Sequence, residues 1–153
     1  EDAAKTDSVV LRLKKIEFTN TLEITDFRKI EITADNVITL TYGETGALQA
    51  TFESSGGYPA VKIAADYFGD QMDFKKMEVM LKNTSPSSVG DKQIYVKIWN
   101  KDIFSATPVN GGDAVTVTCT YDESYTSVSV YTFFLSGSPE GFQFTIESIK
   151  LYC

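Results

Sequence analysis

The chain is divided into short runs rich in β-branched and aromatic residues, and clusters of Gly, Pro, Ser and Asn separate these runs. Helical periodicity is absent from them, and several alternate between apolar and polar residues. A strand that alternates in this way presents one face to a core and the other to solvent. The pattern predicts an all-β protein, a two-sheet antiparallel β-sandwich, with strands at 9–13, 29–33, 37–42, 48–52, 60–63, 76–82, 93–100, 114–121, 127–135 and 142–152.

The alternation also predicts which side chains point outward from three of the strands. In 77–82, 114–121 and 127–131 one parity is mainly apolar and the other mainly polar. If these strands share a sheet with 93–100, the outer face of that sheet carries hydroxyls, aromatic rings and a few charges. The outward set is predicted to be Glu78, Met80, Lys82, Thr116, Thr118, Thr120, Ser127, Ser129 and Tyr131.

Length and charge limit the organisation and the partners of the chain. With 153 residues it is the size of one domain, which we assign to 9–153, and the small polar segment 1–8 is typical of a linker or a processed N-terminus. The net charge of −7 argues against nucleic acid, because phosphate binding requires clustered Lys and Arg. No run of 18 apolar residues is present, so we expect no membrane insertion.

The strand 93–100 contains the strongest indication of a binding surface. Its branched residues occupy one parity, whereas Tyr95, Lys97 and the only tryptophan, Trp99, occupy the other. If the branched set packs into the core, these three side chains and the neighbouring Asn100 lie on an accessible face. Aromatic rings beside hydrogen-bonding groups suit a sugar, which has CH groups on its faces and hydroxyls around its edge. The alternative is that Trp99 and Tyr95 pack under a loop at 102–110.

Catalysis is not indicated by the sequence. The chain contains no histidine, which excludes a Ser/His/Asp triad, a Cys/His pair and imidazole-bound zinc. A glycosidase needs only two carboxylates, but no pair stands out. We therefore expect a protein that is not an enzyme, although carboxylates are available at Glu17, Glu23, Asp66, Asp70, Glu78 and Asp122.

Two further sequence features leave alternatives open. Cys119 and Cys153 fit no metal-ligand spacing, and they are either two free thiols or a disulfide that would stabilise the fold by about 3–4 kcal/mol. A disulfide would imply an oxidising compartment. The segment 83–85 reads Asn-Thr-Ser and matches the acceptor sequence for N-glycosylation, which often occurs by chance.

From about residue 36 to 152 the chain resembles a known family. The segment 141–152 is similar to the final strand of the β-jelly-roll carbohydrate-binding modules of secreted polysaccharide-degrading enzymes, which share the galactose-binding-like sandwich. In that strand an acidic residue between branched residues precedes an Ile-x-Leu ending, as Glu147 does here. The stretches 77–83 and 93–100 also look like the central pair of strands of these modules.

The resemblance implies a jelly roll that binds a plant or microbial polysaccharide without catalysis. It implies a secreted or extracellular module of a larger multimodular protein, which we expect to be a monomer, and a structural calcium held partly by Glu147. The sugar would lie on a concave sheet face with Tyr95, Lys97, Trp99 and Tyr131, or at loops that contain Tyr58, Tyr67, Phe68 and Tyr125. A structural or adhesive sandwich that binds a protein partner is the alternative.

Overall fold

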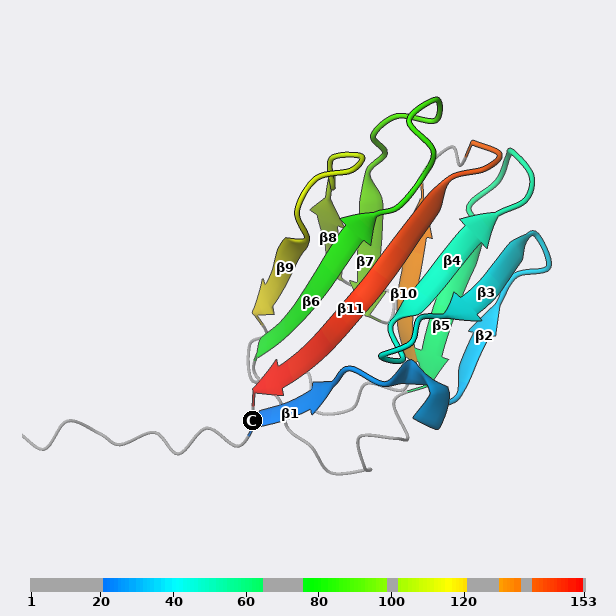
Figure 1. Ribbon diagram of the computed structural model, residues 1–153. Helices are drawn as coiled ribbons and strands as arrows, with labels where there is room; N and C mark the ends of the chain where they lie inside the picture. Colours follow the sequence, from blue (N-terminus) through cyan, green and yellow to red (C-terminus); the bar gives the residue numbers. More distant parts are fainter. Residues whose placement is uncertain (1–20, 65–75, 99–101, 121–129, 136–138, 153) are drawn as a thin grey trace, which may run out of the picture.

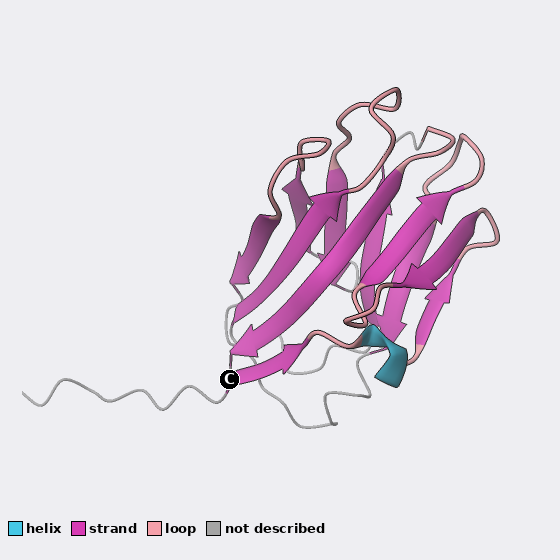
Figure 2. Cartoon of the chain, viewed as in Figure 1, coloured by secondary structure: helices cyan, strands magenta, loops and turns pink. Residues whose placement is uncertain are grey.

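The computed structural model describes residues 21–64, 76–98, 102–120, 130–135 and 139–152 (Figures 1 and 2). These residues form strands and one short 3-10 helix. In chain order the elements are β1 (Thr21–Ile24), η1 (Phe27–Lys29), β2 (Ile32–Ala34), β3 (Ile38–Tyr42), β4 (Leu48–Phe52), β5 (Ala60–Ala64), β6 (Lys76–Asn83), β7 (Ile94–Ile98), β8 (Asp102–Ala106), β9 (Val115–Thr120), β10 (Val130–Leu135) and β11 (Gln143–Tyr152).

The strands form two antiparallel sheets that lie face to face (Figure 1). The front sheet in this view has the order β3-β4-β11-β6-β9, and β1 pairs with the end of β11. The back sheet has the order β2-β5-β10-β7-β8. The predicted all-β, two-sheet sandwich is confirmed.

Most predicted strands are found within a few residues of their predicted bounds. The run 29–33 is an exception, because residues 27–29 form η1, which Asp26 caps by accepting a hydrogen bond from the Arg28 backbone N–H. The strands β1 and β8 were not predicted, and β8 occupies part of the segment expected to be a loop at 102–110. The predicted strand 9–13 lies outside the described residues.

The core between the sheets is aliphatic and aromatic. Strands β4, β6 and β11 alternate between buried and partly exposed residues, as a strand with one buried face must. Phe52 of β4 lies at the centre of an aromatic cluster, with its ring 6.1 Å from Phe142 in an edge-to-face arrangement and 6.0 Å from Phe144. Val96 of β7 and Phe133 of β10, in the back sheet, are fully buried and belong to the same core.

Asn83 connects the loops at one end of the sandwich. Its side chain is 1% exposed, and its Nδ2 donates to the carbonyl oxygens of Gly90 at 3.2 Å and Pro108 at 3.3 Å. Its Oδ1 accepts from the Ser85 backbone N–H at 3.0 Å. Because the side chain is buried and both amide hydrogens are used, the acceptor sequence at 83–85 has a structural role in the folded protein.

Strand β11 changes its neighbour on one side halfway along its length. It pairs with β4 as far as Ile146 and with β1 from Ile149 onward. Between these two segments its pairing with β6 shifts at a β-bulge, between Ile146 and Ser148. Glu147 and Ser148 are both partly buried there, so the alternation of β11 is interrupted at the bulge.

Candidate functional site

Tyr95 lies partly exposed in β7 of the back sheet, and its neighbours Ile94 and Val96 are fully buried. The predicted alternation of this strand is therefore confirmed for its described side chains, and Tyr95 belongs to the outer face. Its hydroxyl donates to the Gln93 side-chain oxygen at 2.9 Å. The register pairs Tyr95 directly with Phe134 of β10, and directly paired residues of antiparallel strands share a face. Two neighbouring positions on the outer face of β7 and β10 are thus aromatic.

A row of polar positions runs beside this aromatic pair. It crosses β5, β10 and β7 at Lys62, Thr132 and Lys97. The Lys62 side chain is 49% exposed, and its Nζ lies 3.8 Å from Oδ1 of Asp35. The other oxygen of that carboxylate accepts from the Ala60 backbone N–H at 2.8 Å, which fixes its position. The outer face of the back sheet therefore offers a positioned ammonium group next to aromatic positions.

The predicted site residues are only partly within the described structure. Tyr95 is on the outer face, and Lys97 occupies a register position of the same parity. Trp99 and Asn100 lie outside the described residues. Of the predicted sheet-face set, the structure therefore brings together Tyr95 and the backbone position of Lys97.

The outward position predicted for Tyr131 disagrees with the strand register. Tyr131 is paired with Ile63 of β5, which is fully buried, so its position belongs to the inner set of the back sheet. Phe133 has the same parity and is also fully buried. The small alternating residues at 127–131 suggested the opposite parity, but the parity of this strand matches the burial of the large aromatic Phe133.

Two positions of this face were missed in the sequence. Lys62 could have been found, because it interrupts the apolar run of β5 at an outward parity. Phe134 could not, because the run Phe133-Phe134-Leu135 is apolar on both parities and gives no alternation. Periodicity identifies a face only when the other face is polar.

The threonine-rich face belongs to the other sheet. Strand β9 pairs with β6 in the front sheet, where Thr118 lies opposite Glu78 and Thr116 opposite Met80. The predicted outward orientation of Thr116, Thr118 and Thr120 is confirmed, since none of the three is buried. Strand β9 and Tyr95 therefore belong to different sheets, so these threonines do not lie on the same face as Tyr95. Strands β6 and β7 are likewise not a pair, because the connection between them passes from the front sheet to the back sheet.

The residues around Glu147 do not form a calcium site on their own. Glu147 is partly buried at the bulge of β11. Calcium takes six to eight oxygen ligands, most often including several carboxylates. Within the described part of the chain, no group of three or more Asp, Glu, Cys or His side chains is close enough to hold a metal ion. The calcium ion therefore stays a prediction.

Of the aromatic residues in the loops predicted as the alternative sugar site, the structure describes one. Tyr58, between β4 and β5, is 71% exposed. Tyr67, Phe68 and Tyr125 lie outside the described residues, and so does Cys153. Cys119 is on β9 and pairs with Met77 of β6, the strand that separates β9 from β11. The disulfide stays a prediction.

Comparison with solved structures identifies similar folds. CBM29-2, a family 29 carbohydrate-binding module solved as a variant with mannohexaose, is similar with a TM-score of 0.59 and 15% identity, over 88% of this chain and 92% of that one. A second variant, solved with cellulohexaose, has the same TM-score and identity over 88% and 91% of the two chains. No protein-family model and no curated protein sequence matches this chain.

A similar fold also occurs inside a much longer protein. PfGH50B has a TM-score of 0.63 and 11% identity over 86% of this chain, and the matched region is 23% of its length. These likenesses show that the chain shares its fold with family 29 carbohydrate-binding modules and with part of PfGH50B. Among the residues that the structure describes, no helix is long and apolar enough to cross a membrane.

Proposed function

We propose that this domain is a non-catalytic carbohydrate-binding module that binds a polysaccharide on the outer face of the back sheet. The observation that carries the proposal is the partly exposed Tyr95, which belongs to the outer face and is paired in register with Phe134. The likeness of the fold to modules solved with hexasaccharides supports it. Trp99, two positions beyond Lys97 in the sequence, has the parity of Tyr95 and is proposed as a further stacking residue.

The chemistry of this face suits a sugar chain. An aromatic ring contacts the CH groups on a sugar face, and Lys62 can donate to hydroxyl or ring oxygens along the edge. We propose the same role for Lys97 and Asn100. Because such contacts remain open to water, the affinity should be weak to moderate.

The parent protein is part of the same proposal. We propose a monomeric module of a larger secreted protein, and the position of a similar domain within the longer PfGH50B supports this organisation. Size-exclusion chromatography should give the mass of one chain. A dimer would contradict the monomer, and a stable protein complex together with no binding to any glycan would favour the adhesive alternative.

The central experiment compares two tyrosine variants. Tyr95→Ala should lower the affinity for soluble mannan or hydroxyethylcellulose at least about tenfold, because stacking is lost. The affinity is measured by retardation in native gels that contain the polysaccharide. Tyr42→Ala is the matched control, since Tyr42 is 43% exposed on β3 of the front sheet. Equal retardation of both variants would contradict a site on the back sheet.

Two further measurements complete the test. If Tyr58→Ala abolished binding and Tyr95→Ala did not, the loop end would be the site. Incubation with mannohexaose or cellulohexaose should release no shorter products. Product release would overturn the non-catalytic assignment.

A further inference from the structure

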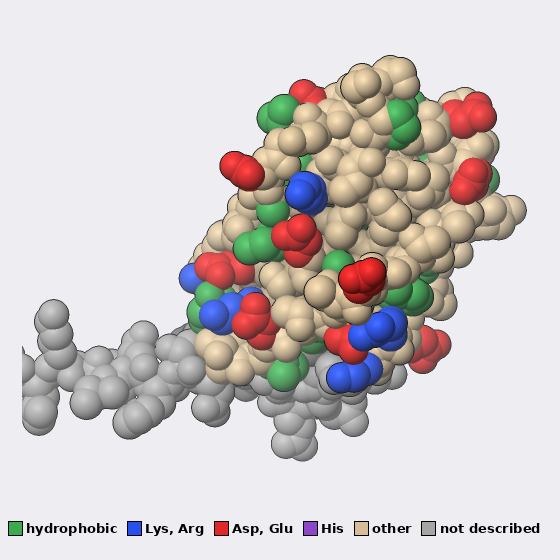
Figure 3. All heavy atoms as spheres, viewed as in Figure 1, with side chains coloured by type: hydrophobic (Ala, Val, Ile, Leu, Met, Phe, Trp, Pro, Cys, Tyr) green, Lys and Arg blue, Asp and Glu red, His purple; other side chains and the backbone are tan. Residues whose placement is uncertain are grey.

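The outer face of the front sheet contains a hollow of about 200 Å³. It lies on the opposite side of the sandwich from Tyr95 and plays no part in the function proposed above. Figure 3 shows acidic and basic side chains intermixed near the lower ends of β6, β9 and β11, on this side of the molecule. The hollow is lined by Glu23, Glu78, Met80, Thr116, Ser148 and Lys150.

The strand register explains why a hollow forms here. One row across the sheet consists of Thr116, Met80 and Ser148, and the next contains Glu78, Lys150 and Glu23. The short Thr and Ser side chains stand beside longer ones, which leaves a depression. Ser148 also lies at the bulge, where β4 no longer pairs with β11 and β1 has not yet begun to pair.

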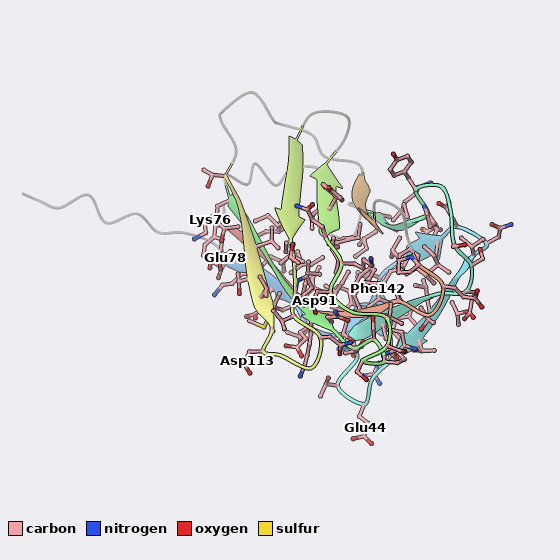
Figure 4. All side chains as sticks on the ribbon, turned by 90° about the horizontal axis from the view of Figure 1, so that it is seen from above. Glu44, Lys76, Glu78, Asp91, Asp113 and Phe142 are labelled. Carbon is pink, nitrogen blue, oxygen red and sulfur yellow. The ribbon has the colours of Figure 1, made fainter. Side chains whose placement is uncertain are left out.

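Glu78 is held in place at the edge of the hollow. Its Oε1 lies 2.7 Å from Lys76 Nζ, and its Oε2 accepts from the Tyr152 hydroxyl at 2.6 Å. Lys76 also lies over the Tyr152 ring, 4.2 Å from its centre. The hydrogen bonds from Lys76 and Tyr152 lower the pKa of Glu78, so its carboxylate is charged at neutral pH. Figure 4 shows Lys76 and Glu78 at one flank of the sandwich, away from Phe142 in the interior.

Among the residues that the structure describes, the other two charged groups of the hollow, Glu23 and Lys150, have no partner for a direct hydrogen bond. Within the described part of the chain, neither Lys150 Nζ nor the Glu23 carboxylate forms an ion pair, although Lys150 Nζ lies 5.3 Å from the centre of the Tyr152 ring. Lys150 thus has ammonium donors available, and Glu23 and Glu78 have acceptor capacity on either side of it in the row.

The balance of charge selects the class of ligand. The lining contains two carboxylates, Glu23 and Glu78, and one ammonium group, Lys150, and Lys76 beside the hollow forms an ion pair with Glu78. An ion of either sign would meet a group of like charge, whereas a neutral polyol can accept from Lys150 and donate to the carboxylates. Met80 adds an apolar contact for CH groups. The volume is below the roughly 300–1,000 Å³ of pockets for drug-sized ligands, which limits the occupant to a single sugar ring.

We propose that this hollow is a second binding site, specific for one neutral sugar residue and independent of the surface around Tyr95. A single residue in a small open site should bind weakly, with a Kd on the order of millimolar. The two sites on opposite faces would allow one domain to contact two chains or two parts of a branched glycan.

The test is an NMR titration of the ¹⁵N-labelled protein with glucose, mannose and galactose. At least one sugar should shift the amide resonances of Glu78, Met80, Ser148 and Lys150 in a saturable way. Lys150→Met keeps the length of the side chain and removes its donors, so it should weaken binding about tenfold or more. Lys82→Met is the matched control, because Lys82 lies on the same face of β6 outside the lining of the hollow.

Each remaining outcome decides the proposal. Glucuronate and glucosamine should bind more weakly than glucose, and tighter binding of either would overturn the assignment to a neutral sugar. No saturable shift with any of the three sugars, or equal shifts in Lys150→Met, would overturn the site itself. Tyr95→Ala should leave these shifts intact, and Lys150→Met should leave polysaccharide retardation intact, so failure of one site is distinguishable from failure of the other.

Discussion

The outer faces of the two sheets use their outward positions differently. On the front sheet the outward side chains of β6 and β11 pair with one another, as Lys76, Glu78 and Tyr152 do. On the back sheet an aromatic residue, Tyr95, lies in the row of positions next to the one that contains Lys62, Thr132 and Lys97. The first face surrounds a small hollow with fixed charges, and the second offers an extended surface.

The difference shows how one β-sandwich can carry two unrelated surfaces. The inward residues of both sheets are constrained by one shared core. There, aromatic and branched side chains must fill the space between sheets about 10 Å apart. The outward residues of each strand do not have to fill a shared core. Substitutions of outward residues should therefore affect one face only, whereas substitutions of inward residues should affect both.

The largest effect is expected for Phe52→Ala. Removing the ring at the centre of the Phe52, Phe142 and Phe144 cluster leaves a cavity and should lower the free energy of unfolding by about 3–5 kcal/mol. Urea unfolding followed by circular dichroism measures this loss. Tyr42→Ala, on the neighbouring strand and exposed, should change it by about 0.5 kcal/mol or less. If polysaccharide binding survived in urea that unfolds the front sheet, the two faces would not share one cooperative core.

A smaller effect is expected for Asn83→Ala. The substitution leaves the carbonyls of Gly90 and Pro108 and the Ser85 N–H without their partner, which should cost about 1–3 kcal/mol. Ser87→Ala, exposed in the same loop, is the control. Expression in a eukaryotic secretory host, followed by mass spectrometry, should show folded protein without a glycan at Asn83. A stable, fully glycosylated protein would contradict the buried position of this side chain.

The front sheet was the easier part to predict from the sequence. In β6 and β9 the two parities differ clearly in polarity, so alternation alone identifies the outward side chains of Glu78 and Thr118. The residues that face one another could not be identified in this way. That Glu23, Lys150 and Glu78 form one row depends on pairing among β1, β11 and β6, which are far apart in the chain.

The back sheet shows where periodicity fails. The alternation at 127–131 predicts an outward position for Tyr131, but the register places this position on the inner face, and Phe134 follows in a run that is apolar at every position. Strand β8 was not predicted, because it begins directly after the predicted strand 93–100, in a segment expected to be a loop at 102–110. Which strands share a sheet is a property of long-range pairing, and nothing in a local pattern determines it.

Acid should remove a contribution to stability that comes from Asp26, the residue that caps η1. The Arg28 side chain, hydrogen-bonded to Asp26, lowers the pKa of that carboxyl from 3.8 to about 2. A lowered pKa in the folded state contributes stability above the unfolded value, and this contribution is lost as the pH falls from about 4 to about 2. Asp26→Asn should therefore show a shallower loss of stability in this window. Glu44→Gln, in the β3–β4 turn, is the control, and equal slopes for Asp26→Asn and the wild type would contradict the role of Asp26.

The smallest expected effect concerns Glu147, which lies on the front sheet but belongs to neither surface. If this side chain helps to hold a structural calcium ion, as the resemblance implies, calcium at a few times its Kd should stabilise the fold by about 1 kcal/mol. For a domain of this size that raises the Tm by roughly 2–4 °C. A chelator should reverse the change, and Glu147→Gln should abolish it, while Glu140→Gln should not. An identical Tm with calcium and with chelator would remove Glu147 from the set of metal ligands, and the bulge in β11 would then matter only for the shape of the hollow beside Ser148.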